Sequence, residues 1–424
     1  MKHRSLRILT AALLVAAMIV GCSVQAMASE NAEIEIFTRF ADGASKAYFD
    51  ELAAGYMQAN PNVKVIVTSA DNQNYKQEIN VRLASNDTPD IYFAWSGVYA
   101  KNFVDGGRAL DLTPYMEQDA DWANRVIKSQ WGPFTYDNKT YGVPIIMDGK
   151  TFYYNKAIFS ELGLSVPENW DEFMAVLAKL AQTDYTPISL GNSEDWATGH
   201  YMTTLNQRVV PAEVLAADYA LESEKPFSDP SYVQALEYLN QMVPYFTKDC
   251  NAVGYDQGIN DFITGKAAIY YEQFNQVQYI MPATFEWGWF DFPDIDGAAG
   301  DQNALTGAPQ GFMVSADTQY PDVCVDFLKY MTTVENAGKM VKDTSMISTV
   351  DGAITTETSN ETLVEIAQTI KKASSINLWL DNATNSEVVA TYLADIQAMV
   401  GGSMTAQQVM DEVQAKAAEV KAFQ

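Results

Sequence analysis

Basic residues are scarce in this sequence. Its 424 residues include 27 Lys and Arg against 54 Asp and Glu, which gives a formal net charge of −27. Affinity for phosphate backbones comes mainly from Lys and Arg, so we expect no nucleic-acid partner. Aromatic residues are plentiful, with 23 Tyr, 19 Phe and 8 Trp, which excludes a chain that is disordered throughout. The length predicts two or three domains.

Catalytic motifs are missing as well. Only two histidines occur, His3 and His200, and His3 lies in the N-terminal leader described below. There is no G-x-S-x-G turn, no H-E-x-x-H helix and no glycine-rich nucleotide fingerprint. The acids Asp291, Asp294 and Asp296 miss the calcium-loop spacing and predict a solvated turn. We therefore expect no enzymatic activity, no cofactor and no metal site.

Long hydrophobic runs are limited to the N-terminus. Lys2, Arg4 and Arg7 precede an apolar run over Ile8–Val20, which is too short to span a bilayer of about 30 Å as a helix and is typical of a signal peptide. We assign residues 1–21 to this leader and expect the protein to be exported. No later run reaches the roughly 18 apolar residues of a spanning helix.

The leader ends in a motif that resembles a lipidation site. Residues 19–22 read Ile-Val-Gly-Cys, which resembles the bacterial lipobox, where the Cys is acylated and becomes the mature N-terminus. Cys22 is thus the candidate lipid attachment site, with residues 22–32 as a polar tether. An ordinary A-x-A cleavage site at Ala26–Ala28 is the alternative. The expected location is the outer face of the cell membrane, or the periplasm.

Cysteine is rare, because only Cys250 and Cys324 follow Cys22. A disulfide between them can form in an exported protein, because the compartment outside the cytoplasm is oxidising. Cys324, however, lies on the apolar side of a predicted helix over Pro321–Leu328, which favours a buried free thiol.

The N-terminal third alternates strands and helices. Strands are predicted at Ile34–Thr38, Val63–Val67 and Ile91–Ala94, with apolar residues at helical spacing over Phe49–Met57 and Tyr75–Leu83 between them. This βαβαβ pattern indicates a mainly parallel sheet with helices on both faces.

Ligands of open parallel sheets bind beyond the C-terminal ends of the strands. The loop after the first strand carries Arg39 and Phe40, and the loop after the third carries Trp95 and Ser96. These loops are therefore candidates for a binding site, and Trp95 as a hydrophobic cap over the sheet is the alternative.

Later segments are more helical. A helix begins near Trp170, strands are predicted over Lys266–Tyr271 and Trp287–Pro293, and the C-terminal stretch from Asn385 forms two helices broken at Gly401–Gly402. Thr405 is the expected N-cap of the second of these helices.

Several aromatic residues stand in polar, loop-like surroundings. They are Trp95, Trp196, Phe274 beside Asn275, and Trp379 close to Asp381. A sugar ring offers an apolar face to an aromatic ring and a rim of hydroxyls to polar side chains. Such patches suit carbohydrate, although core packing explains any one of them equally well.

A series of short motifs resembles the extracellular solute-binding proteins of ABC importers, in the sugar-binding family that includes maltose-binding protein. The resemblance covers nearly all of Glu33–Val420. Its motifs are Asn60–Val65, Leu83–Ile91, Asp111–Tyr115, Tyr141–Pro144, Tyr153–Phe159 and Gly311–Ser315.

The resemblance implies two α/β lobes of the periplasmic-binding-protein type with ligand in the cleft. It places three hinge crossings near Pro144–Asp148, Tyr271–Asn275 and Asp343–Ile347. The expected lobes are residues 33–144 and 276–343 for lobe 1, and residues 145–275 and 344–424 for lobe 2.

The resemblance also implies roles for single residues. It carries ligand contact to the loops at Arg39 and Trp95, to Asp148 after the hinge proline, and to Trp379 and Asp381. Where the family usually has a Gly-Trp type motif, this chain has Glu-Gln-Phe-Asn over residues 272–275. The ligand contact expected at this place is therefore assigned to Phe274 or Asn275. The full expected ligand-binding set is Arg39, Phe40, Trp95, Ser96, Asp148, Trp196, Phe274, Asn275, Trp379 and Asp381.

The expected function is a monomeric, lipid-anchored receptor that closes on a mono- or oligosaccharide and delivers it to an ABC permease. Two alternatives stay open. A polyamine or other cationic ligand would also suit acidic residues beside aromatic rings. An anchored glycosidase could use two of the many carboxylates.

Overall fold

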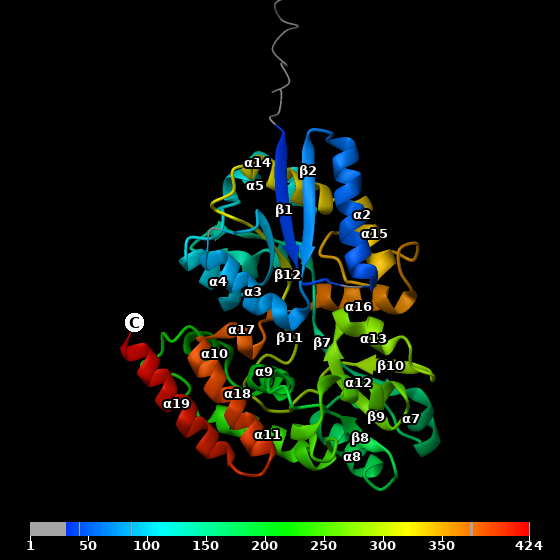
Figure 1. Cartoon of the computed structure of the whole chain (residues 1–424). Helices are drawn as coiled ribbons and strands as arrows, with labels where there is room; N and C mark the ends of the chain where they lie inside the picture. Colours follow the sequence, from blue (N-terminus) through cyan, green and yellow to red (C-terminus); the bar gives the residue numbers. More distant parts are fainter. Residues whose placement is uncertain (1–30, 42, 86, 374–375, 424) are drawn as a thin grey trace, which may run out of the picture.

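The computed structural model describes residues 31–41, 43–85, 87–373 and 376–423, which form two lobes, each built on its own β-sheet (Figure 1). The expected leader, Cys22 and most of the expected tether lie outside the described residues. The tether prediction is wrong at its last residue, because strand β1 already begins at Ala32. In the described part of the chain no helix is long and apolar enough to cross a membrane.

The sheet of lobe 1 has five strands. Their spatial order is β2 (Val63–Ser69), β1 (Ala32–Thr38), β3 (Ile91–Trp95), β12 (Gln310–Val314) and β6 (Gly142–Ile146). Strand β1 runs parallel to both β2 and β3, as the βαβαβ pattern predicts. Strand β12 is antiparallel to β3 and to β6, so the sheet is mixed.

The helices of lobe 1 bury apolar residues against this sheet in one core. Phe49 of the first helix reaches Phe312 of β12, with the ring centroids 5.6 Å apart. The α-helices are α2 (Gly43–Ala59), α3 (Asn72–Ala84), α4 (Val98–Asp105), α5 (Thr113–Gln118), α6 (Ala120–Ala123), α14 (Pro321–Met331) and α15 (Val334–Thr344). Shorter elements are the 3-10 helices η1 (Lys128–Gln130) and η2 (Gly132–Phe134) and the hairpin of β4 (Thr135–Tyr136) and β5 (Lys139–Thr140).

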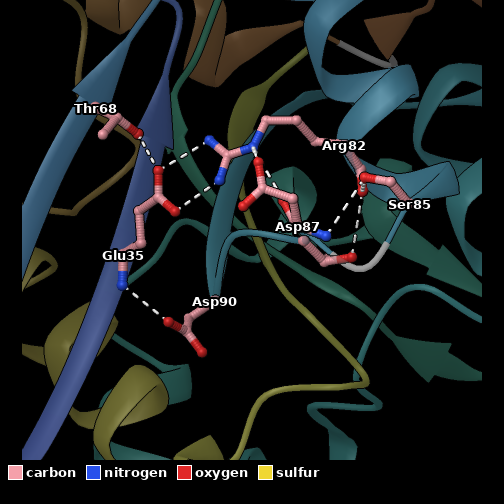
Figure 2. A network of polar contacts seen from close by, with 7 residues as sticks. Glu35, Thr68, Arg82, Ser85, Asp87 and Asp90 are labelled. Carbon is pink, nitrogen blue, oxygen red and sulfur yellow. Dashed lines mark hydrogen bonds and ion pairs between the residues drawn. The ribbon is translucent and has the colours of Figure 1, made fainter.

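An ion pair ties helix α3 to the sheet. The Arg82 guanidinium donates to both carboxylate oxygens of Glu35 on β1, at 2.8 and 2.6 Å, and the Thr68 hydroxyl donates to the same carboxylate (Figure 2). The Asp90 carboxylate accepts from the Glu35 backbone amide at 2.8 Å. Burial raises the pKa of Glu35, but the hydrogen bonds from Arg82 and Thr68 and the charge of Arg82 outweigh it, so the pKa is lowered overall.

Replacing Arg82 with methionine is expected to lower the free energy of unfolding by about 1–2 kcal/mol, because a partly buried carboxylate loses a bidentate partner. Since the pKa of Glu35 is lowered in the fold, the contribution of the pair is present above about pH 4.5 and is lost as the pH falls further. Urea unfolding of wild type, R82M and R82M/E35Q at pH 7 and pH 3.5 measures this. Equal losses for R82M at both pH values would contradict it.

The sheet of lobe 2 has four strands. Their order is β10 (Trp287–Phe290), β7 (Lys150–Asn155), β9 (Ala267–Gln273) and β8 (Thr186–Ser189). Side chains alternate between its faces with the period of two expected of a strand. Phe152 and Tyr271 join the main core of the lobe, whereas Tyr153 and Tyr270 join a smaller core on the opposite face.

The helices of lobe 2 cover both faces of that sheet. The main core holds α8 (Trp170–Leu180), α9 (Trp196–Val209), α11 (Ser231–Met242), α18 (Ser386–Val400) and α19 (Ala406–Ala422), and the smaller core holds α12 (Tyr255–Ile263), α13 (Val277–Ile280) and α16 (Glu361–Lys372). The other elements are α7 (Lys156–Leu162), α10 (Ala212–Tyr219), α17 (Leu380–Ala383), the 3-10 helices η3 (Val243–Tyr245), η4 (Cys250–Ala252) and η5 (Phe274–Gln276), and the pair of β11 (Leu305–Thr306) with β13 (Ile376–Asn377). Thr405 caps α19 in a capping box with Gln408, as predicted.

Within the described residues the chain passes between the lobes three times, and the structure corrects the place of two crossings. The first lies between the end of β6 at Ile146 and the start of β7 at Lys150, so it overlaps the expected Pro144–Asp148 region. The second does not follow Tyr271–Asn275, because β10 pairs with β7 in the sheet of lobe 2. The chain returns to lobe 1 only between β11 and β12, so the assignment of residues from 276 to β11 to lobe 1 is wrong.

The third crossing also comes later than expected. Val350 and Ala353 still belong to the core of lobe 1, and Ser348 bridges to Ile146 of β6. The next helix, α16, packs in lobe 2, so the chain crosses between Ala353 and Glu361 rather than at Asp343–Ile347.

The two described cysteines are free and buried in different lobes. Cys250 packs in the main core of lobe 2 and Cys324 in the core of lobe 1. The disulfide alternative is therefore wrong, and the buried-thiol interpretation of Cys324 is confirmed.

Candidate ligand-binding site

A cleft of about 450 Å³ opens between the lobes. From lobe 1 it is lined by Arg39, Lys76, Trp95 and Gln310. From lobe 2 its aromatic and acidic lining consists of Trp196, Tyr255, Trp379, Glu194, Asp256 and Asp381. An adjoining pocket of about 220 Å³ shares Arg39 and Gln276 with it and is also lined by Phe40 and Asn275.

Arg39 occupies the loop directly after β1. Its guanidinium donates to the side-chain oxygen of Gln310 at 2.8 Å and lies 4.4 Å from the centroid of the Phe40 ring. Its Nε is buried and has no hydrogen-bond partner in the part of the chain that the structure describes. Burial lowers the pKa of Arg39 to about 10, which leaves the side chain charged at neutral pH.

Trp95 ends β3 and stands at the edge of the cleft. Its ring packs edge-on against Phe93 at 4.9 Å and Tyr99 at 5.1 Å, and the Lys76 ammonium lies 4.8 Å from its centroid. The neighbouring Ser96 is fully buried and does not line the cleft. The loop after β3 thus offers the cleft a partly exposed indole but not the expected hydroxyl.

Trp196 opens helix α9 on the lobe 2 side. Its ring lies 5.0 Å from His200 and 5.0 Å from Tyr255, so three rings from two helices meet there. Glu194 accepts from the Tyr255 backbone amide at 3.1 Å, which holds the start of α12 beside α9.

Trp379 is the residue directly before α17, and Asp381 lies in the first turn of that helix. Trp379 is almost buried, because its ring stacks on the His200 imidazole with centroids 4.3 Å apart and planes at 25°. Asp381 lines the cleft, and one of its carboxylate oxygens is buried without a hydrogen-bond partner among the described residues. Burial raises the pKa of Asp381, while the nearby charges of Lys76 and Lys150 oppose the rise.

Three expected ligand contacts lie elsewhere. Phe274 is fully buried and packs edge-on against Trp289 at 5.5 Å, so it is part of the smaller core of lobe 2. Asp148 is fully buried at the first crossing and accepts from the Gly149 amide at 2.8 Å and from Asn275 Nδ2 at 2.8 Å. The side chains of Ser96, Asp148 and Phe274 therefore do not line the cleft.

Other cleft residues escaped the sequence analysis. Besides Lys76, Glu194, Tyr255 and Asp256, the missed residues are His200, Gly254, Gln273, Gln276, Gln310 and Asn382. His200 had one usable signal, because it is the single histidine after the leader. The others lie in helices, strands and loops without a distinguishing local pattern, and only the packing of the lobes brings them together.

A second cavity of about 500 Å³ lies within lobe 2, away from the lobe 1 residues. Arg208, Asp291 and Phe290 are among its lining residues. We take the cleft as the candidate site because both lobes line it, which couples ligand contact to their relative position.

The cleft sets rings from both lobes beside cationic donors and carboxylate acceptors, on two lobes joined by three crossings. This arrangement defines a two-lobed ligand-binding protein. The chain belongs to the bacterial extracellular solute-binding protein family, whose model matches residues 41–338. It is accordingly a binding protein and not an enzyme, so the glycosidase alternative is wrong.

Known proteins resemble the chain over most of its length. The Multiple sugar-binding protein of Streptococcus mutans serotype c is 26% identical over 302 residues, which are 68% of this chain and 68% of that protein. The bacterial solute receptor AcbH, described as preferring b-D-galactopyranose exclusively, has a TM-score of 0.83 at 18% identity and covers 92% of this chain and 100% of its own. A chitin oligosaccharide binding protein has a TM-score of 0.82 at 21% identity, with 92% and 99% covered. These structures confirm the fold.

Proposed function

We propose that this protein binds a carbohydrate, a mono- or oligosaccharide, between its lobes and presents it to the permease subunits of an ABC importer. The composition of the cleft carries the proposal, since rings from both lobes stand beside cationic donors and carboxylate acceptors. A sugar has an apolar face for the rings and hydroxyls that both donate and accept. The names of the relatives, one sugar-binding and one chitin oligosaccharide binding, support it.

The proposal includes the place where the protein works. A lipid on Cys22 holds it, as a monomer, at the outer face of the cell membrane, where solute arrives before transport. The support for this part is the basic and apolar leader and the lipobox-like residues 19–22.

A polyamine is the second candidate, because Glu194, Asp256 and Asp381 line the cleft. Arg39 and Lys76 line the same cleft, however, and a polycation there would meet two like charges. A neutral polyhydroxylated ligand can use both signs of charge as hydrogen-bond partners. The cleft therefore favours sugar.

Ligand acts by stabilising the closed arrangement of the lobes. It does so only to the extent that it binds that arrangement more tightly than the open one, and so it must contact both lobes. A micromolar dissociation constant corresponds to about −8 kcal/mol, which a few stacked rings and charge-assisted hydrogen bonds supply.

A thermal-shift screen against mono- and oligosaccharides and polyamines tests the proposal. We expect one glycan class to raise the melting temperature selectively, since ligand at about 100 times its Kd stabilises the fold by about 2.7 kcal/mol. At the same glycan concentration the variant W196A should keep only about a third of this stabilisation, about 0.9 kcal/mol, if its Kd is about 30-fold weaker. If only polyamines raise the melting temperature, the carbohydrate proposal is wrong and the second candidate, a polyamine ligand, replaces it.

A further inference from the structure

A buried lysine lies behind the cleft. It contacts His200, the single histidine among the described residues. The Nζ of Lys150, the first residue of β7, is 2.9 Å from Nδ1 of His200 on α9. Lys150 is 4% exposed and His200 5%. Among the described residues, no carboxylate lies within ion-pair distance of Lys150, which is unusual for a buried ammonium.

This contact determines which nitrogen of the ring carries the proton. An ammonium has three donors and no acceptor, so Nδ1 of His200 must offer a lone pair to Lys150. A neutral imidazole with an unprotonated Nδ1 carries its proton on Nε2. Burial, reinforced by the charges of Lys150 and Lys76, holds the pKa of His200 well below its usual value, so the ring is neutral.

Lys150 itself keeps its proton at neutral pH. Burial lowers its pKa to about 8, and the facing carboxylates of Glu272, Asp148 and Asp381 limit the fall. The ammonium also lies 4.9 Å from the Tyr271 ring centroid and 5.9 Å from that of Trp196, which adds cation–π attraction.

The imidazole is held in one orientation. One side stacks on Trp379 at 4.3 Å, and Trp196 lies 5.0 Å away. His200 lines the cleft, and within the described ranges its Nε2 has no hydrogen-bond partner and is not fully buried. Nε2 is therefore the ring nitrogen that is available to a ligand.

We propose that Lys150 is a positioning residue that sets the Nε2–H form of His200, and that this N–H donates to an acceptor oxygen of the ligand beside Trp196. The ligand part rests on the proposed function and narrows it to sugars that place a hydroxyl or ring oxygen next to that indole. The part about the imidazole is independent of any ligand.

Nitrogen-15 NMR of the imidazoles tests the first part in the unaltered chain. Only His3 and His200 contribute, and the signals of His200 are identified by their loss in H200Q. At pH 7 we expect Nδ1 of His200 in the range of an unprotonated nitrogen and Nε2 in the range of a protonated one. A proton on Nδ1, or a doubly protonated ring, overturns the proposal.

Variants of Lys150 test the positioning role. K150R still only donates and should keep the Nε2–H form, whereas K150M should yield a mixture of the two forms. Replacing a buried charge with an apolar side chain of similar size is often neutral or stabilising, so K150M is expected to fold. An unchanged spectrum in K150M shows that Lys150 does not set the form. If K150M does not fold, the wild-type spectrum at about pH 9.5 decides. Lys150, whose pKa burial lowers to about 8, is then an uncharged amine that can also accept, so a mixture of the two forms is expected, and an unchanged Nε2–H form overturns the positioning role.

Glycan affinity tests the donor role, using the sugar identified in the thermal-shift screen. H200F, which lacks a donor, should weaken binding about tenfold, the worth of one hydrogen bond, whereas H200Q keeps an N–H near the position of Nε2 and should lose less. Equal affinity of H200F and wild type overturns the donor role. If no sugar binds wild type, the proposed function fails, while the NMR result stands on its own.

Discussion

Replacing Asp148 with alanine is expected to lower the free energy of unfolding by about 3 kcal/mol or more, because several buried donors lose their acceptor together. The oxygens of its carboxyl group accept from the amide of Gly149 at 2.8 Å, the amide of Asn275 at 3.2 Å and the Nδ2 of Asn275 at 2.8 Å. These bonds join the first crossing to η5, the 3-10 helix directly after β9. Urea unfolding of D148A measures the loss, and a stability equal to wild type would contradict this account.

Asp148→Asn is the matched control. It keeps an acceptor for the two backbone amides, and its new N–H can reach the Asn275 side-chain oxygen, which is buried without a partner, once the Asn275 amide turns over. We expect D148N to lose less than about 1 kcal/mol. Neither variant should change ligand affinity more than about twofold, because Asp148 does not line the cleft.

The pH dependence gives an independent check. Burial raises the pKa of Asp148 to about 8, with the backbone donors of Gly149 and Asn275 opposing the rise and the charge of Glu272 adding to it. A raised folded-state pKa contributes stability that is complete below about pH 4 and is lost as the pH rises toward 8. Wild type should therefore lose stability relative to D148N across that window. A constant difference would contradict the assignment.

Trp196→Ala and Trp95→Ala are each expected to weaken glycan binding by about 30-fold, equivalent to about 2 kcal/mol, because each removes a large aromatic surface from a ligand that both lobes must hold. Trp95 belongs to lobe 1 and Trp196 to lobe 2. The double variant should bind too weakly to raise the melting temperature. Isothermal titration calorimetry with the glycan from the screen measures the single variants.

Trp287→Ala is the control for these variants. Trp287 is also partly exposed, but it lies on β10 of lobe 2, where its ring packs edge-on against Tyr153 at 5.6 Å. It does not line the cleft, so we expect a loss of stability with affinity within about twofold of wild type. If W287A weakens binding as much as W196A, the loss reports damage to the fold and not removal of a stacking ring.

Local patterns carried the prediction of the N-terminal strands and helices. The alternation at β1 and the helical spacing at α2 reflect burial on one face, which depends on residues near in sequence. The cap at Thr405 is equally local, since its partner Gln408 is three residues away. Such features follow from short-range sterics and hydrogen bonding, and the sequence contains all of that information.

The course of the chain between lobes was predicted less well. The Phe274 region looked like a loop with an exposed ring, but α13 and β10 continue in lobe 2 and cover it. Strand pairing between β10 and β7 joins residues more than 130 positions apart in the sequence. No local pattern specifies such a partner, because many strands of similar composition could pair.

The sequence by itself determined the class of protein: an exported, acidic, two-lobed α/β chain with aromatic residues in polar loops and no catalytic motif. The tertiary structure alone decided which of those residues form the cleft. It placed Trp95 and Trp196 there, buried Phe274, and set Lys150 behind His200. The physical reason is that a ligand site depends on the orientation of side chains from distant elements, which the packing of both lobes fixes only once the whole chain has folded.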